Sequence, residues 1–416
     1  MSLCSEAWWL TNIPPAAAPR NLPSLRRHKS DEGKHQKLQR LHHDVRIGRF
    51  DLKERLQPKE TAAAMCTHHS PGPHRDPLHC ILPPHILEHL ARHGSAHHRQ
   101  WAIKSLTQSA RLHGRREVLS RMLGIFPSGG DVKRRTIFNA QEGEDLPGVV
   151  VRREGDPPSA DVAVNEAYDG AGATYDFYKE QFNRNSLDDN GMRLDSTVHY
   201  SDHYDNAFFD GKQMVYGDGD GQLFKRFTIA VDVIGHELTH GVTAFSAGLL
   251  YRDQPGALNE SISDVFGSLV KQYQTKQSAQ DADWLIGAGL LADGIHGVAL
   301  RSMKAPGTAY DDPVLGKDPQ PAHMKDFVRT TSDNGGVHIN SGIPNHAFFL
   351  VATALGGNAW ERAGRIWYAA LKQFSPETDF HGAAQIIVQT ARTLFKPGST
   401  EEKAVIEAWQ NVGIAV

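Results

Sequence analysis

The chain has 416 residues, of which 39% are hydrophobic, and a formal net charge of −3. A chain of this length is expected to form two or three folding units. It contains no run close to the roughly 18 consecutive apolar residues of a membrane-spanning helix, and its three cysteines, Cys4, Cys66 and Cys80, are too few for a disulfide framework. These features exclude a transmembrane protein and a disulfide scaffold.

The small net charge conceals a marked asymmetry along the chain. Residues 1–135 contain 23 Lys and Arg against 11 Asp and Glu, a net charge of +12, whereas the remainder carries −15. A basic segment and an acidic body in one chain should attract each other, unless the basic segment binds another anionic partner. The basic charge alone is weak evidence for binding of nucleic acid, because residues 1–65 contain no recognisable module for it; that alternative would require the basic segment to be retained and to bind in a salt-dependent way.

Residues 1–65 show little helical or strand periodicity and are rich in Arg, Lys, His and Pro. We expect a disordered extension; the alternative is a reading frame called too early, with translation starting at Met65. The apolar run Ala7–Leu10 is too short for the core of a secretory signal peptide.

Residues 66–134 are predicted to form a short helical unit. Its apolar residues recur at helical spacing with basic residues between them. They are Ile86, Leu87, Leu90 and Ala91, followed by Trp101, Ile103, Leu106 and Ala110. The Gly/Pro/Ser segment Gly124–Gly130 resembles an exposed linker, where proteolytic nicking tends to occur.

The rest of the chain indicates an α+β fold, with a β-rich half over residues 135–228 and a helical half over residues 229–416. Gly148–Arg152 and Thr197–Tyr216 have the patterns of strands in an antiparallel sheet. A helix is predicted from Ala163 to Phe182, and the chain after residue 229 is predicted to be mostly helical. Such an arrangement tends to leave a cleft at the junction of its halves.

The strongest chemical signal is an H-E-x-x-H element, His236 to His240, within an apolar helical pattern. Four residues make slightly more than one helical turn, so both imidazoles lie on one face and can bind a single cation. Glu237 then lies beside the metal, where a base is needed to take a proton from water.

A third ligand is predicted at Glu260, near the start of a second apolar helix. Asp264 lies one turn further on and can accept the second ring N–H of a liganding histidine. Alone, these two residues could be mere charges favoured near a helix start. The H-E-x-x-H element upstream favours the metal site.

Seven blocks of sequence, in order, resemble the thermolysin family of neutral zinc metallopeptidases over roughly residues 136–416. They are Asn206–Phe209, Met214–Gly221, His236–His240, Gly248–Tyr251, Asn259–Asp264, Leu300–Met303 and Asp333–Gly342. The resemblance implies one zinc ion held by His236, His240 and Glu260, with a fourth position open for water. Asp264 and Asn259 would support the ligands.

The resemblance also assigns roles in catalysis. Glu237 would deprotonate the metal-activated water and later protonate the leaving amine. Tyr251 and His338 would stabilise the oxyanion, and Asp333 would orient His338. Singly, Tyr251 could be a packing residue and His338 an ordinary loop histidine, but the matched blocks favour the catalytic roles.

Substrate contacts are implied in the same way. Arg301 would bind a substrate carbonyl, and Asn206 with the backbone of Ala207 would align the peptide as an added strand. The pocket for the side chain after the cut would consist of apolar residues, although a core role for them stays open. They are Phe224, Phe227, Val233 and Leu300.

The sequence departs from the family at the paired calcium site. Asp232 and Asp283 align with two of its carboxylates, but Lys271, Leu285 and Ala288 occupy positions expected to supply other ligands. Calcium requires oxygen ligands. We therefore predict that the calcium site is lost and that Lys271 bridges Asp232 and Asp283 with its own charge.

The segment Cys80–Leu87, with Pro83-Pro84, resembles the short precursor segment of protealysin-type members of the family. This implies a zymogen in which a basic propeptide, residues 66–134, covers the acidic catalytic unit in cis. We call this propeptide the pro-segment. Cys80 could bind zinc through its thiolate, or it could be a small buried side chain of the propeptide.

We therefore interpret the chain as a zymogen of a zinc endopeptidase that cuts proteins or peptides on the amino side of bulky hydrophobic residues, with no membrane partner. The alternative is a catalytically silent peptide-binding or adhesive protein on the same scaffold. The family resemblance implies secretion; because no signal peptide is recognisable, a cytoplasmic location with non-classical export is the alternative.

Overall fold

The computed structural model describes residues 79–120 and 130–416, without the side chains of residues 79 and 109–120. All of these residues belong to the compact unit His69–Val416. The predictions for residues 1–65, including the start at Met65, and those for most of the linker lie outside the described residues.

A six-stranded mixed sheet forms the first half of the unit, in the order β1-β5-β6-β4-β2-β3. Its strands are β1 (His79–Cys80), β2 (Arg135–Asn139), β3 (Val149–Arg153), β4 (Leu194–Val198), β5 (Ala207–Phe209) and β6 (Gln213–Tyr216). The expectation of an antiparallel sheet was wrong for two pairs, since β4 runs parallel to both β2 and β6. Parallel neighbours require a long crossover, which the helix α3 provides between β3 and β4.

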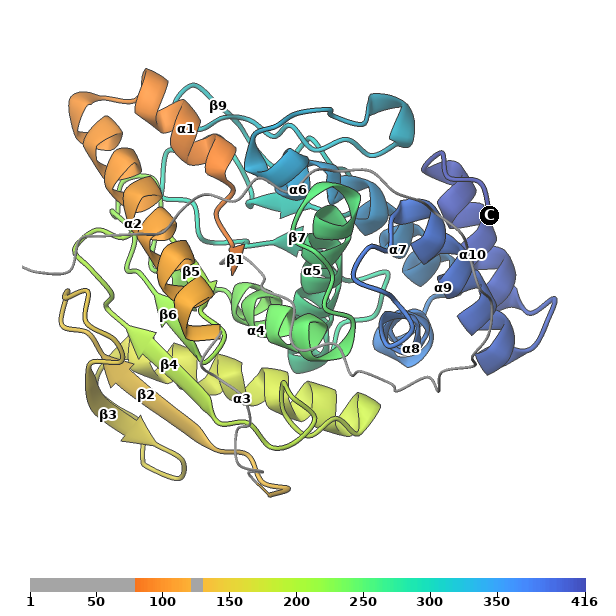
Figure 1. Ribbon diagram of the computed structural model, residues 1–416, viewed down its shortest axis with the longest axis horizontal. Helices are drawn as coiled ribbons and strands as arrows, with labels where there is room; N and C mark the ends of the chain where they lie inside the picture. Colours follow the sequence, from red (N-terminus) through yellow and green to blue (C-terminus); the bar gives the residue numbers. More distant parts are fainter. Residues whose placement is uncertain (1–78, 121–129) are drawn as a thin grey trace, which may run out of the picture. The chain divides into compact units, whose positions relative to one another are not determined.

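Helix α3 (Val162–Phe182) begins one residue before the predicted start at Ala163. The carboxylate of Asp161 accepts hydrogen bonds from the backbone N–H groups of Ala163 and Val164, and Asn183 ends the helix in a left-handed conformation. The helix contacts β2, β4 and α4, so it joins the sheet to the helical half (Figure 1).

Two long helices, α4 (Val231–Ser246) and α5 (Asp253–Thr275), lie between the sheet and the helices that follow them in the chain (Figure 1). They pack closely because glycines face each other. A Cβ atom on Gly267 would lie 2.4 Å from the carbonyl oxygen of Asp232, and one on Gly235 would lie 3.1 Å from the Cα of Gly267. The close approach brings side chains of the two helices together at their buried faces.

The later helices cover α5 and complete the core. They are α6 (Asp333–Asn340), α7 (Gly342–Leu355), α8 (Arg365–Leu371), α9 (Phe380–Phe395) and α10 (Thr400–Asn411), with short helical turns at Phe227–Ile229, Met324–Asp326 and Trp360–Gly364. The prediction of a mostly helical second half is confirmed, although residues 276–332 contain no α-helix. Glycines and prolines recur there. Its strands are β7 (Leu285–Ile286), β8 (Arg301–Ser302), β9 (Asp311–Asp312) and β10 (Gly316–Lys317).

The predicted helical unit before residue 130 forms α1 (Pro84–His93) and α2 (Ala96–Ser120). Pro84 occupies the first turn of α1, where its missing N–H has no cost. Ile86, Leu87 and Leu90 are buried in the main core, whereas Ile103 is exposed. The segment before α1 adds strand β1 to the edge of the sheet, antiparallel to β5.

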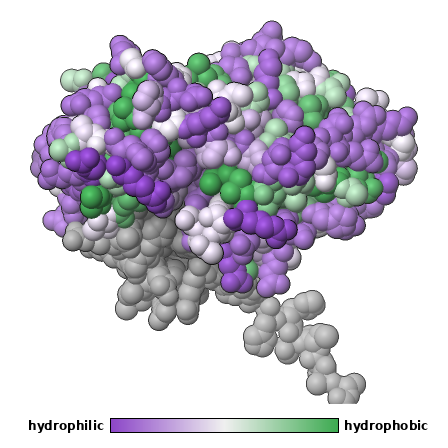
Figure 2. Space-filling model, turned by 90° about the horizontal axis from the view of Figure 1, so that it is seen from above, coloured by the Kyte–Doolittle hydropathy of each residue, from purple (hydrophilic) through white to green (hydrophobic). Residues whose placement is uncertain are grey.

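The face of the molecule in Figure 2 is mostly hydrophilic, with hydrophobic residues in small separate patches. No helix among the described residues combines the length and the apolar character needed to cross a bilayer.

His199 links three segments of the first half. Its Nδ1 lies 2.7 Å from Asp218 Oδ2, and its Nε2 lies 2.7 Å from Asp161 Oδ2, the residue that caps α3. The hydrogen bond that His199 donates to Asp218 and the further contact with Asp161 outweigh partial burial and raise the pKa of His199 to about 9.

This arrangement predicts a stability that depends on pH. Because the pKa of His199 is raised from 6.5 to about 9 on folding, its stabilising contribution is complete below about pH 6.5 and is lost as the pH rises through 9. Urea unfolding of His199→Gln should therefore show a larger deficit at pH 6 than at pH 9.5. The exposed His381→Gln is the control. An equal His199→Gln deficit at both pH values would contradict the ionic role.

Candidate active site

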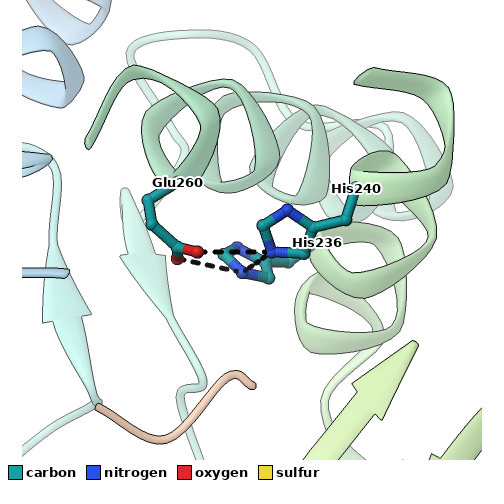
Figure 3. Close-up of side chains that lie close together, drawn as sticks. All are labelled: His236, His240 and Glu260. Atoms are coloured by element: carbon teal, nitrogen blue, oxygen red, sulfur yellow. Dashed lines mark hydrogen bonds and ion pairs between the residues drawn. The ribbon is translucent and has the colours of Figure 1, made fainter. Parts of the chain in front are cut away.

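Three buried side chains from α4 and α5 converge in the interior (Figure 3). His236 and His240 come from α4 and Glu260 from α5, and their ligand atoms lie within 4.8 Å of one another. This is the group of three metal ligands that the sequence predicts. Within the described residues, Cys80 is not a member of the group.

The second nitrogen of each imidazole is already engaged. His236 Nδ1 lies 2.8 Å from Asp264 Oδ1, and His240 Nδ1 lies 2.9 Å from Asn259 Oδ1. With these nitrogens as donors, the two Nε2 atoms direct their lone pairs at each other across 3.0 Å. Glu260 adds oxygens 3.4 and 3.5 Å from these atoms. Either a proton on one ring or a metal ion between the two nitrogens satisfies this arrangement.

Two imidazoles and one carboxylate are the donor set of a catalytic zinc site. Burial opposes protonation of His236, but the hydrogen bond and charge of Asp264 outweigh it and raise its pKa to about 9. A metal ion must displace the proton from this ring, while the contact with Asp264 fixes Nε2 toward the site. Burial lowers the pKa of His240 to about 3, which keeps that ring neutral. The residues present therefore fit zinc.

Glu237 is fully buried beside this group. Its Oε2 accepts a hydrogen bond from the backbone N–H of Phe209 on β5 at 3.1 Å. Its Oε1 has no hydrogen-bond partner within the described part of the chain. Burial raises the pKa of Glu237 to about 8, so this carboxyl group can hold a proton near neutral pH.

Tyr251 and His338 both lie next to Glu260, the third residue of the group. The Tyr251 hydroxyl donates to Glu260 and lies 3.2 Å from His338 Nε2. Asp333 accepts from His338 Nδ1 at 2.6 Å and from its backbone N–H at 2.9 Å. Asp333 and the three residues after it have positive φ angles, so this tight loop turns the carboxylate back onto the imidazole. Burial opposes the charge of His338, but Asp333 outweighs it and raises the pKa to about 9.

Asp264 connects the metal ligands to Arg301. Its two oxygens accept from Arg301 Nε and Nη2, each at 2.8 Å. The same carboxylate accepts from His236 and from Asn345 Nδ2, the latter also at 2.8 Å. Arg301 is 2% exposed, and this bidentate pairing compensates its buried charge.

The segment before α1 lies in this site in an extended conformation. Ile81 N–H donates to the Ala207 carbonyl at 3.2 Å, and Leu82 N–H donates to Asn206 Oδ1 at 3.0 Å. Arg301 Nη1 donates to the Ile81 carbonyl at 3.0 Å.

The carbonyl of the preceding residue, Cys80, lies 3.1 Å from His338 Nε2. The Cys80–Ile81 peptide bond is thus held by predicted catalytic and substrate-binding residues. The Cys80 side chain is buried and belongs to an apolar cluster with tyrosines of the first half, which favours the small buried side chain over a zinc ligand.

The predicted pocket residues are all buried, in the same apolar cluster as Ile81. They are Phe224, Phe227, Val233 and Leu300.

Sequence reasoning missed three polar contacts at the site. Ser263 Oγ lies 3.0 Å from His240 Nδ1, Gln320 Nε2 donates to the His338 carbonyl at 2.8 Å, and Asn345 donates to Asp264. Ser263 lies one residue before Asp264 in a matched block, so its position could have indicated it. The other two are uncharged and far from the motif in sequence.

Two family models match most of the chain beyond the pro-segment. The thermolysin metallopeptidase catalytic domain matches residues 132–244, and its alpha-helical domain matches residues 247–414. The chain therefore belongs to the thermolysin family of metallopeptidases.

Individual relatives extend the similarity into the pro-segment. The chain is 51% identical to an extracellular metalloprotease of Pectobacterium carotovorum subsp. carotovorum, over 82% of this chain and 97% of that protein. It is 51% identical to protease PrtS of a Photorhabdus strain, over 81% and 92% of the two chains. The structure of the protealysin precursor from Serratia proteamaculans matches with 53% identity and a TM-score of 0.74, covering 81% of this chain and all of that one.

The metal-ligand geometry and these comparisons agree. The chain is a thermolysin-like zinc endopeptidase whose metal site consists of His236, His240 and Glu260, and it is a homologue of a protease precursor. The predicted zinc enzyme is confirmed, and the alternative of a catalytically silent scaffold is set aside.

Proposed function

We propose that the enzyme binds an extended peptide as an added strand on β5 and cuts it where Cys80–Ile81 now lies. The observation that carries this proposal is the set of four backbone contacts made by Cys80, Ile81 and Leu82. In a substrate, the Ala207 carbonyl accepts from the N–H of the scissile bond, Arg301 donates to the carbonyl of the residue after the cut, and Asn206 accepts from the next N–H.

Proton transfer falls to Glu237 in this proposal. Bound zinc supplies Lewis acidity, which makes water nucleophilic at neutral pH. Glu237 takes the proton from the attacking water through its unpartnered Oε1 and delivers it to the leaving amine. Tyr251 and His338 donate hydrogen bonds to the oxyanion, and Asp333 holds His338 in the required orientation.

The preference for the side chain just after the cut follows from the surroundings of Ile81, which lies at that position in the pro-segment. Ile81 is completely buried in the main apolar core, which also contains the four predicted pocket residues. A bulky apolar side chain after the cut gains about 1.5–3 kcal/mol from such burial, whereas a carboxylate would be buried without a partner. The favoured substrates are therefore proteins or peptides cut on the amino side of Leu, Ile or Phe.

The same contacts make the full chain latent, because the pro-segment and a substrate require the same hydrogen-bonding groups. The propeptide then acts in cis as an inhibitor of its own enzyme. Relatives from Pectobacterium and Serratia are named extracellular, and we propose secretion of this enzyme too. Cell fractionation with a cytoplasmic marker distinguishes this from retention in the cytoplasm.

The division of labour between metal and base predicts different defects. Glu237→Gln should retain one zinc per chain and lose at least about 10²-fold in kcat, whereas His240→Ala should lose both zinc and activity. An added protease first removes the pro-segment. Metal analysis then measures the zinc content of each variant, and hydrolysis of a peptide with Leu after the cut measures its kcat. A peptide with Asp in place of Leu should resist cleavage.

His346→Ala, which removes a half-buried histidine outside the site, is the control and should behave as wild type. Wild-type turnover by Glu237→Gln would disprove its role as the base, and stoichiometric zinc in His240→Ala would disprove the ligand set.

Latency predicts that one pro-segment side chain controls activity. Ile81→Asp should activate the uncut chain at least about tenfold, because about 1.5–3 kcal/mol of apolar burial is lost and a carboxylate cannot enter the pocket. Hydrolysis of a quenched fluorescent peptide, with intact mass followed in parallel, measures this. Ile103→Asp is a matched control on the exposed face of α2. Equal latency of the two variants would refute the proposal.

We also propose that Lys271 replaces the calcium of the family. Its Nζ lies 2.8 Å from Asp232 Oδ2, 2.8 Å from Asp283 Oδ1 and 2.7 Å from the Leu285 carbonyl. Burial disfavours its charge, but the two carboxylates outweigh it and raise the pKa of Lys271. These contacts between the ammonium and the two acids support the proposed replacement.

Removal of this charge should leave Asp232 buried and unpaired. Lys271→Met is therefore expected to lower the free energy of unfolding by about 3 kcal/mol, whereas Lys317→Met, which breaks an exposed pair with Asp311, should change it by less than about 0.5 kcal/mol. Calcium added at constant zinc should not stabilise the wild type. Tight stoichiometric calcium binding by the wild type would contradict the replacement.

A further inference from the structure

The Asp264 carboxylate is unusual in the number of donors that it satisfies. Oδ1 accepts from His236 Nδ1 and Arg301 Nη2, and Oδ2 accepts from Arg301 Nε and Asn345 Nδ2, all at 2.8 Å. A carboxylate has about four acceptor sites, so all are occupied. Three of the four donors belong to the zinc ligand and the substrate-binding arginine. The fourth, Asn345, has no role in the sequence motifs.

Asn345 lies on α7, two helical turns after His338, and is 1% exposed. Within the described residues its Oδ1 has no hydrogen-bond partner. Burying an unpaired amide oxygen is unfavourable, and a leucine of similar shape would avoid that cost. The Asn345 side chain uses only its N–H, which it directs at Asp264. This points to a function of Asn345 as a hydrogen-bond donor and not merely as a packing residue.

The donor from Asn345 acts on the orientation of the carboxylate. Arg301 already makes a bidentate contact, but Arg301 must also donate to the backbone carbonyl of whatever peptide fills the site, as it does to Ile81. A carboxylate held only by Arg301 and His236 would move with either of them. The Asn345 amide, attached to a buried helix, supplies a contact that does not depend on substrate or metal.

We propose that Asn345 is a positioning residue, which holds Asp264 so that His236 presents Nε2 to zinc while Arg301 presents Nη1 to the substrate carbonyl. This inference rests on the proposed roles of Asp264 and Arg301. It predicts that loss of one uncharged amide weakens metal binding and substrate binding together, although Asn345 touches neither.

The test compares Asn345→Leu with Gln272→Leu in the full chain. Gln272 is an equally buried amide on α5 whose Oε1 also lacks a partner within the described residues, and its Nε2 donates only to Ser268 in α5 itself. Zinc content is measured at buffered free zinc, the melting temperature is measured on metal-free protein, and KM is measured after removal of the pro-segment.

Asn345→Leu should bind zinc about tenfold more weakly, the lower end of the range for residues that support metal ligands, and should raise KM, with an unchanged or higher melting temperature. Gln272→Leu should leave zinc affinity and KM unchanged. Asn345→Asp preserves the shape but places a second carboxylate against Asp264, so its zinc affinity should be lower still; this variant also serves if Asn345→Leu does not fold.

Wild-type zinc affinity in both Asn345 variants would overturn the inference. A loss of zinc affinity that matches a fall in melting temperature would also overturn it, because a packing role predicts that result. Equal zinc affinities in Asn345→Leu and Asn345→Asp would overturn it for the same reason. Asp264→Ala distinguishes a failure of the proposed role of Asp264 from a failure of the role of Asn345. If it retains zinc affinity and KM, the proposed role of Asp264 fails; if it loses both while Asn345→Leu loses neither, only the role of Asn345 fails.

Discussion

The structure depends on one electrostatic constraint, the meeting of two imidazole nitrogens in a site without access to bulk water. His236 Nε2 and His240 Nε2 lie 3.0 Å apart, and their other nitrogens are fixed by Asp264 and Asn259. Two facing lone pairs are tolerable only when a proton or a metal ion lies between them. The close packing of α4 on α5, which glycines permit, adds Glu260 as the third ligand. The packing of the two helices thus builds a donor set that fits zinc.

In the function that we propose, one set of groups serves both catalysis and inhibition. The edge of β5, Asn206, Arg301 and His338 can bind any extended backbone, because backbone hydrogen bonds carry no sequence information. The pro-segment satisfies them with its own chain, and Ile81 adds apolar burial. Attachment in cis gives the pro-segment a high effective concentration. In this account, latency requires no separate inhibitory site.

The metal site could be predicted from sequence in part because its determinants within each helix are local. Periodicity places the two histidines on one face of α4, and Glu260 and Asp264 on one face of α5, whereas the meeting of the two faces was implied by the resemblance to the family. The mixed character of the sheet could not be predicted, because the direction of β4 depends on how α3 crosses the sheet. Asn345 was also beyond prediction: an uncharged amide about 80 residues from its partner leaves no pattern in a single sequence.

We expect zinc to occupy the site formed by His236, His240 and Glu260 while the pro-segment lies across it. Anomalous diffraction at the zinc absorption edge, from crystals of the uncut chain, tests both parts in one measurement. The account predicts a single strong peak bonded to the two Nε2 atoms and to Glu260, with Ile81 in the pocket beside it. A peak bonded to the Cys80 thiolate, an empty site in zinc-containing buffer, or a cleft without the pro-segment would contradict it.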